Sequence, residues 1–217
     1  MTKRTGGGQS YRTELVRKAI HLCSLSIPLV YFFVSDATAL SVLAPLTILS
    51  LLIDVARFYH PSTSQLYYRV FGWLLRTHEA DHDRKRLTGA TYVLLSATLC
   101  ILIFPKIIVI TAFSILIISD TVAALVGMRY GRHRFLRKSL EGALAFFLSA
   151  LIVVGVTPKA AYLPIEYLIG FLGALAGTFV EALSIAVDDN LSIPLSIGAL
   201  MWVLYVLLFP SGLEALQ

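Results

Sequence analysis

The residues with the greatest chemical potential stand in one stretch, 119–142, of an otherwise largely apolar chain. Asp120 directly follows the apolar run 107–118, and Gly127 and Gly131 come after it. Asp120, Ala124, Gly127 and Gly131 are spaced by four, three and four residues, which places them on one face of a helix. A carboxylate is a hard oxygen ligand of the kind that binds Mg²⁺. The stretch therefore predicts a cation site beside a helix face lined by small residues.

A cluster of cations follows the acid within the same stretch. The basic residues are Arg129, Arg132, Arg134, Arg137 and Lys138. Ser139 can then cap a new helix, and Glu141 falls in its first turn, where the helix dipole favours an acid. A helix start preceded by a lysine is a phosphate-binding arrangement. Together these features describe a site for a nucleoside triphosphate with Mg²⁺. A solvated basic loop and close packing of helices through small residues are the simpler explanations.

The composition indicates a membrane protein. Hydrophobic residues make up 57% of the chain, charged residues 14%, and the mean hydropathy is +0.79, whereas soluble domains average about 25% charged residues. Seven apolar windows are present: 19–35, 38–56, 87–104, 107–127, 142–157, 163–186 and 191–209. All but 142–157 reach the 17–25 residues, roughly, that cross a bilayer. We expect one all-α integral membrane domain over 1–217 with about seven transmembrane helices and a disordered segment 1–10. A very apolar soluble helical domain is the disfavoured alternative.

The basic residues predict the orientation. With a cytoplasmic N-terminus, sixteen of the eighteen Lys and Arg residues fall inside, in the N-terminal arm and the loops 57–86 and 128–141, and only Lys106 and Lys159 fall outside. This agrees with the positive-inside rule. The net charge of +5 is therefore explained by topology and requires no nucleic-acid partner. The short chain favours a prokaryotic plasma membrane, with the site facing the cytoplasm.

The loop 57–86 is too long for a simple turn. Within it, residues 65–76 place four apolar side chains on one side of a helix: Leu66, Val70, Trp73 and Leu74. Arg69 and Arg76 lie off that stripe. This pattern predicts an interfacial helix on the cytoplasmic leaflet. Such a helix could guide a lipid substrate or simply anchor the connection.

Five carboxylates gather near one end of the predicted helices. Asp54, Asp120 and Glu181 lie inside apolar windows, and Asp188 and Asp189 follow shortly after Glu181. A charge at mid-helix costs about 2.5–3.5 kcal/mol on the insertion scale, so intramembrane acids are functional candidates. In the expected topology all five lie toward the cytoplasmic face, with the basic loops as counter-charges.

Two of these acids have structural explanations as well. Asp54 precedes Arg57 by three residues, which predicts a structural ion pair. Three glycines share the helix face of Glu181: Gly170, Gly173 and Gly177. Such a stripe is typical of close helix packing, and it would also allow a ligand to approach.

Four stretches carry a resemblance to a known family. The central one reads Asp120-x-x-Ala123-x-x-x-Gly127-x-x-x-Gly131, followed by Lys138-Ser139-x-Glu141-Gly142. The others are Glu14-Leu15-x-Arg17-Lys18-x-x-His21, then Arg76-x-x-Glu79 with Leu87-Thr88-Gly89-Ala90-Thr91-Tyr92, and Val180-Glu181-Ala182 with Asp188-Asp189-Asn190-Leu191-x-Ile193-Pro194-Leu195. The chain resembles the membrane CTP-dependent lipid kinases, the family of dolichol kinase and phytol kinase, over residues 14–195. The resemblance implies transfer of the γ-phosphate of CTP to a lipid alcohol of the polyprenol, phytol, dolichol or diacylglycerol type.

The residues and the resemblance together predict the site. We expect these catalytic residues: Asp120, Lys138 and Asp188. We expect Mg²⁺ to be held by Asp120, Glu181, Asp188 and Asp189. We expect the nucleotide to be bound by Arg17, Lys18, His21, Gly127, Gly131, Arg132, Lys138, Ser139, Glu141 and Gly142. The expected partners are a membrane lipid and the nucleoside triphosphate, and a second copy of the chain would be compatible with this arrangement.

Two other functions remain open at this point. Phosphatidate cytidylyltransferases share a similar central motif, but they continue into a Pro-Gly-His-Gly-Gly signature where this chain has Asp188-Asp189-Asn190. A transporter or channel would also be built from several helices, but its acids would lie at the bilayer midplane and not at one face.

A zinc-protease pattern is also present, at His78-Glu79-Ala80-Asp81-His82. In zinc proteases this motif lies on a helix that is buried by apolar neighbours. Here the flanking residues are mostly charged, which disfavours a protease.

Overall fold

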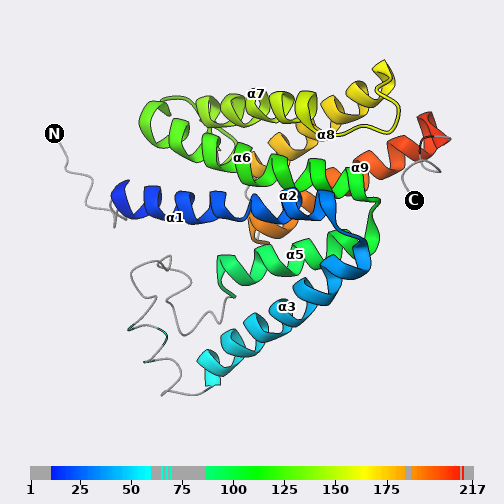
Figure 1. The fold of residues 1–217 in the computed structure, drawn as a ribbon. Helices are drawn as coiled ribbons and strands as arrows, with labels where there is room; N and C mark the ends of the chain where they lie inside the picture. The colour runs from blue at the N-terminus through cyan, green and yellow to red at the C-terminus, as the bar shows by residue number, and fades with distance from the viewer. Residues whose placement is uncertain are drawn as a thin grey trace.

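The computed structural model describes residues 11–59, 65, 67, 69, 87–183, 187–210 and 212. The structure is a helical bundle with one short antiparallel strand pair (Figure 1). Its elements are α1 (Tyr11–Cys23), α2 (Ser26–Phe33), α3 (Asp36–Tyr59), α5 (Gly89–Ile103), α6 (Lys106–Tyr130), β1 (Arg134–Phe135), β2 (Lys138–Ser139), α7 (Leu140–Val156), α8 (Pro164–Leu183) and α9 (Asp189–Leu208).

Within the described residues, five helical segments are long and apolar enough to cross a membrane. They are Glu14–Phe33, Asp36–Tyr59, Lys106–Tyr130, Pro164–Leu183 and Asp189–Leu208. Helices α5 and α7 are apolar but shorter, with 15 and 17 residues, or about 22 and 25 Å against a hydrocarbon core of about 30 Å. The chain is thus an all-α membrane protein, as predicted, while the count of seven spans and their orientation remain predictions.

Proline explains why the first predicted span is built from two helices. Pro28 has no N–H, so the carbonyl of Ser24 cannot receive the usual bond from four residues ahead. The N–H of Ile27 donates to that carbonyl instead, three residues back, at 2.9 Å. The backbone tightens locally, and α1 and α2 continue one after the other along nearly the same line (Figure 1).

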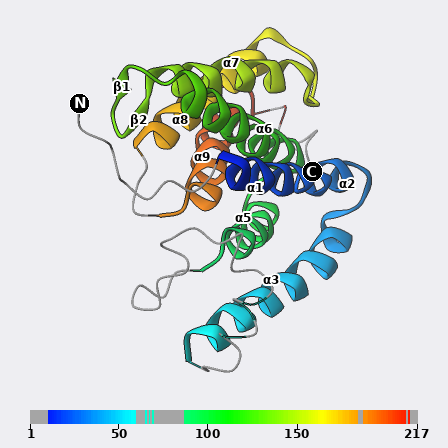
Figure 2. The ribbon, with the colours of Figure 1, turned by 90° about the vertical axis from the view of Figure 1, so that its left-hand side faces the viewer.

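Helix α6 forms the centre of the bundle. It packs most extensively against α7 and also touches α1, α2, α5, α8 and α9. Its side chains are apolar on nearly all sides, as expected for a helix that is covered all round. Helix α3 packs on α5 and leans away from the other helices (Figures 1 and 2).

The loop after α6 contains a hairpin that the sequence analysis did not predict. Strands β1 and β2 pair through Arg134 with Ser139 and Phe135 with Lys138. The hairpin rests on the end of α8, where the Arg137 N–H donates to the Ala182 carbonyl at 3.1 Å. This contact fixes the hairpin and its basic residues relative to α8.

Two predictions fall mainly outside the described residues, and the motif stretches 76–79 and 78–82 lie outside them entirely. The expected disordered segment 1–10 is one. The interfacial helix at 65–76 is the other: of its residues only Gln65, Tyr67 and Arg69 are described, and these are helical.

Candidate active site

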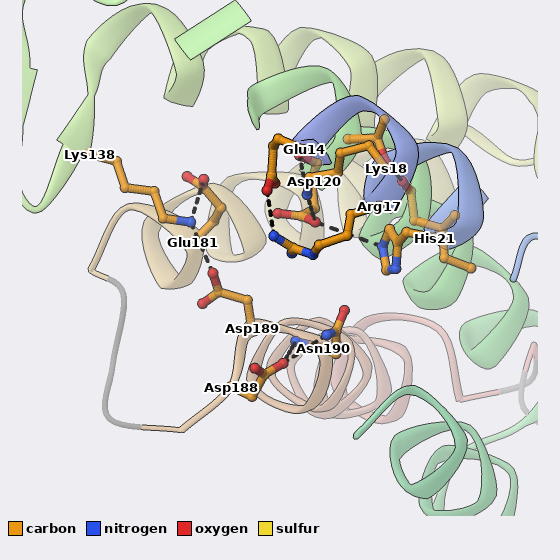
Figure 3. A network of polar contacts seen from close by, with 12 residues as sticks. Glu14, Arg17, Lys18, His21, Asp120, Lys138, Glu181, Asp188, Asp189 and Asn190 are labelled. Carbon is orange, nitrogen blue, oxygen red and sulfur yellow. Dashed lines mark hydrogen bonds and ion pairs between the residues drawn. The ribbon is translucent and has the colours of Figure 1, made fainter. Parts of the chain in front are cut away.

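Charged side chains from five elements meet at one end of the bundle (Figure 3). We call this group the ion-pair cluster, and it consists of Lys18, Asp120, Lys138, Glu181 and Asp189. They come from α1, α6, β2, α8 and α9, respectively. Segments far apart in the sequence therefore contribute one side chain each, which is typical of a functional site in a membrane bundle.

One half of the cluster joins α1 to α6. The Lys18 ammonium lies 2.5 Å from Asp120 Oδ2 and 3.3 Å from the Asp120 carbonyl oxygen. His21, one turn further along α1, places its Nε2 3.7 Å from the same carboxylate oxygen. Lys18 is only 4% exposed, so its charge requires this partner. Arg17 pairs with Glu14 on the same helix.

The other half joins the hairpin to α8 and α9. The Lys138 ammonium donates to Glu181 Oε1 at 2.7 Å and to Asp189 Oδ2 at 3.0 Å. Burial disfavours the charge on Lys138, but the carboxylates of Asp189, Glu181 and Asp120 outweigh it and raise the pKa of the lysine above its ordinary value. Because Asp120 contributes to this shift, the two halves form one electrostatic unit. Lys138 is therefore a cation throughout the physiological pH range.

The cluster contains a carboxylate oxygen with spare bonding capacity. Glu181 Oε2 is buried and has no hydrogen-bond partner in the described part of the chain, and the same holds for Ser192 Oγ. An unsatisfied buried polar atom costs about 1–3 kcal/mol. Such atoms point to a ligand that would complete their bonding.

The donor set fits Mg²⁺ when the ion brings part of its own coordination shell. Carboxylate oxygens are the hard ligands that this ion prefers, and it is usually bound by one or two carboxylates together with phosphate oxygens and waters. Among the described residues, no group of three or more His, Cys, Asp or Glu side chains surrounds a single point. Waters or oxygens from a bound nucleotide would therefore complete the site.

Asp188 and Asp189 do different things although they are neighbours. Asp188 caps α9, because its Oδ1 accepts from the Asn190 N–H at 3.0 Å and from Asn190 Nδ2 at 2.8 Å. Ser96 Oγ on α5 donates to the Asn190 carbonyl at 2.7 Å. The start of α9 is thus held in place, and the structure brings Asp189, not Asp188, against Lys138.

The glycine face of α6 packs against the start of α7. A Cβ added at Gly127 would lie 3.0 Å from Ser139 Oγ and 3.7 Å from the Gly142 Cα. At Gly131 an added Cβ would come within 2.9 Å of the Ser139 side chain. Close helix packing therefore explains these glycines, and their predicted nucleotide contacts remain predictions.

The start of α7 is held by bonds within the loop. Ser139 caps the helix as predicted, accepting from the Gly142 N–H at 3.1 Å. Glu141 accepts from the Arg132 N–H at 3.1 Å and from the His133 ring Nδ1 at 2.7 Å. These bonds shape the loop so that the side chain of Arg132 is exposed.

Asp54 belongs to a separate, buried network between α3 and α5. Its Oδ2 accepts from the Thr88 N–H at 2.8 Å and from Thr91 Oγ1 at 2.7 Å, and its Oδ1 lies 3.2 Å from the Arg57 guanidinium. Both charged side chains are 1% exposed. The predicted structural ion pair is confirmed.

Comparison with known proteins decides the family. The chain is 30% identical over 169 residues to CTP-dependent diacylglycerol kinase 1 of Schizosaccharomyces pombe, covering 70% of this chain and 74% of that protein. The chain belongs to the CTP-dependent lipid kinase family. This lipid kinase is also 33% identical over 102 residues to phytol kinase of Synechocystis, covering 43% and 44% of the two chains.

A further relative spans nearly the whole chain. An uncharacterized protein of Rickettsia prowazekii is 32% identical over 190 residues, which cover 87% of the lipid kinase and 93% of that protein. No protein-family model matches the chain, and no solved structure matches it.

Three of the four stretches that carry the family resemblance meet in the ion-pair cluster of this lipid kinase. Sequence reasoning missed two serines, Ser96 on α5 and Ser192 on α9. Each is a lone serine in an apolar helix, and only the fold reveals that Ser96 holds the start of α9 and that the Ser192 hydroxyl has no partner among the described residues.

Proposed function

We propose that the chain transfers the γ-phosphate of CTP to a long-chain lipid alcohol, with Mg²⁺, at the cytoplasmic face of the membrane. The observation that carries this proposal is the ion-pair cluster. It joins the acid of the central family motif to cations from α1 and from the hairpin, and those cations match the phosphate-binding chemistry that a kinase of this family requires.

The cluster can supply the main ingredients of phosphoryl transfer. This reaction depends mostly on positioning and on stabilising negative charge on the transferred group. Lys18, Lys138 and Arg17 would contact the phosphates, with Arg132 at the solvent side. Asp120 with Glu181 or Asp189 would hold Mg²⁺, which neutralises the charge of the phosphates. Asp188 would act through its cap, by holding the start of α9 and so the position of Asp189.

The relatives suggest which acceptor to test first. The diacylglycerol kinase matches over 74% of its length and the phytol kinase over 44%. We therefore propose diacylglycerol as the first candidate, with phytol and polyprenols next. A long-chain alcohol would reach the cluster from the bilayer, between helices whose outward side chains are apolar.

The cytoplasmic face is proposed from charge. The hairpin and α1 carry basic residues next to the cluster, and the positive-inside rule places such residues in the cytoplasm. A prokaryotic plasma membrane remains our expectation for the location.

The test is a transfer assay with purified protein and a panel of lipid alcohols. With γ-labelled CTP and Mg²⁺ we expect label in the lipid, in preference to γ-labelled ATP. Label from α-labelled CTP in the lipid, with release of pyrophosphate, would instead establish a cytidylyltransferase. Absence of lipid labelling from any nucleotide would refute the proposal.

A further inference from the structure

The position of Lys138 is that of a cation between two carboxylates. Its ammonium lies 2.7 Å from Glu181 Oε1 and 3.0 Å from Asp189 Oδ2, and the acids come from different helices. Without Lys138, two carboxylates would face each other across a partly buried space with no counter-charge between them. Lys138 therefore supplies the positive charge that lies between the two carboxylates.

Other groups at this point remain unsatisfied by the lysine. Glu181 is 3% exposed, and its Oε2 has no partner within the described residues. Ser192, whose buried hydroxyl also has no partner among the described residues, lies three residues after Asp189 and so on the same face of α9, but only the Glu181 oxygen belongs to a side chain that Lys138 contacts. An ammonium group has only three donors in a fixed tetrahedral arrangement, whereas a divalent cation can take six oxygens. The site offers more oxygen ligands than Lys138 uses.

The hairpin can stay in place if the Lys138 side chain leaves. The Arg137 N–H is bonded to the Ala182 carbonyl at 3.1 Å, and the Phe135 ring packs 6.4 Å from the Phe179 ring, centroid to centroid. Both contacts tie the hairpin to α8 independently of the Lys138 side chain. The lysine stem is long and flexible, and the side chain is 28% exposed. It can therefore change partners without movement of the backbone.

We propose that Glu181 and Asp189 form the binding site, here called the metal seat, of a divalent cation. Without the metal, the Lys138 ammonium occupies the position between the two carboxylates, and when the metal binds, this side chain turns to the nucleotide phosphates. This inference rests on the proposed function and refines it, because it separates the metal seat from Asp120, which Lys18 neutralises. Before the metal binds, the Lys138 ammonium is the counter-charge of both carboxylates. Afterwards the same charge is available where the phosphates lie. The metal and Lys138 thus compete for the same two carboxylates.

The test measures Mn²⁺ binding to purified protein in detergent, by equilibrium dialysis or electron paramagnetic resonance, without nucleotide or lipid. Lys138→Met removes the competing charge and keeps the length of the side chain. We expect it to bind Mn²⁺ at least about tenfold more tightly than the wild type, because a nearby cation opposes an incoming dication. Lys106→Met, at the opposite end of α6, serves as the control and should leave the affinity unchanged.

Further variants keep the proposal testable if Lys138→Met does not fold. Glu181→Gln and Asp189→Asn, each with Lys138 in place, should weaken Mn²⁺ binding about tenfold, since each removes one carboxylate of the seat. Unchanged affinity in both would overturn the proposal, and so would a Lys138→Met protein that binds Mn²⁺ as the wild type does or more weakly. Because no nucleotide or lipid is present, these results are independent of the transfer assay that tests the proposed function.

Discussion

Helix α8 carries a buried glutamate near each end, and the surroundings of the two are opposite. Glu166, in the first turn, is 0% exposed and accepts four hydrogen bonds. The donors are the N–H groups of Ala160, Ala161 and Leu163 and the hydroxyl of Tyr205. Glu181, near the last turn, is also buried, but one of its oxygens meets Lys138 and the other has no partner among the described residues.

The difference separates an acid that holds the fold from one that is available to a ligand. The four hydrogen-bond donors to Glu166 come from the α7–α8 connection and from α9, so the carboxylate ties these two parts of the fold together. Glu181 is bonded to one side chain, Lys138, and has one buried oxygen without a partner among the described residues, which native interiors otherwise avoid. Both glutamates are buried, and they differ in how many hydrogen-bond partners their carboxylate oxygens have.

The largest effect is expected at Asp120, an acid of the ion-pair cluster. Asp120→Asn keeps the size of the side chain and removes the charge that holds the Lys18 ammonium in place, so transfer should fall by at least about 10²–10³-fold. The rate of phosphoryl transfer measures this. Because Lys18 would lose its buried counter-charge, the double variant Lys18→Met/Asp120→Asn is the control for folding. If Asp120→Asn retains nearly wild-type turnover, Asp120 is a structural acid like Asp54.

A smaller effect should separate the two neighbouring acids of α9. Asp189→Asn removes a charged partner of Lys138 and should lower turnover about 10–100-fold, the range of a charge-assisted hydrogen bond. Asp188→Asn is the matched control, since Asn caps a helix about as well as Asp. It should change turnover about threefold at most. Equal losses in both variants would give Asp188 a direct role in the reaction.

The smallest effect is expected at the first turn of α8, around Glu166. Tyr205→Phe removes one of the four donors to Glu166 and should lower the free energy of unfolding by about 0.5–1.5 kcal/mol. Denaturant titration in detergent measures this change. Turnover per folded molecule should be unaffected, because Tyr205 contacts the far end of α8. A clear loss of turnover without loss of stability would contradict the assignment of a structural role to Glu166 and a functional role to Glu181.

The sequence predicted the parts of the fold that depend on local signals. Apolar windows located the helices, Ser139 was identified as a cap, and Asp54 with Arg57 as an ion pair. The break between α1 and α2 also had a local signal, Pro28, that the hydropathy window overrode. The charged residues of the ion-pair cluster were proposed as site residues from their types and motifs, but their pairing was not predicted.

The remaining features depend on long-range contacts or on unusual backbone geometry. Lys18 and Asp120 are 102 residues apart in the chain, and nothing local specifies that they meet. The hairpin turns at Leu136, whose φ of 52° lies in the left-handed region. Since Gly, Asn or Asp usually mark such turns, the hairpin had no sequence signal. The partners of the α6 glycines likewise required the packing of α7.

The measurement that tests the central claim most directly compares Glu181→Gln with Glu166→Gln in one preparation, recording turnover per folded molecule and the free energy of unfolding. We predict that Glu181→Gln loses about 10²-fold in turnover with little loss of stability. Glu166→Gln should lose about 1–3 kcal/mol of stability while its folded fraction turns over normally. A Glu181→Gln protein with wild-type turnover, or a well-folded Glu166→Gln protein without activity, would contradict the account.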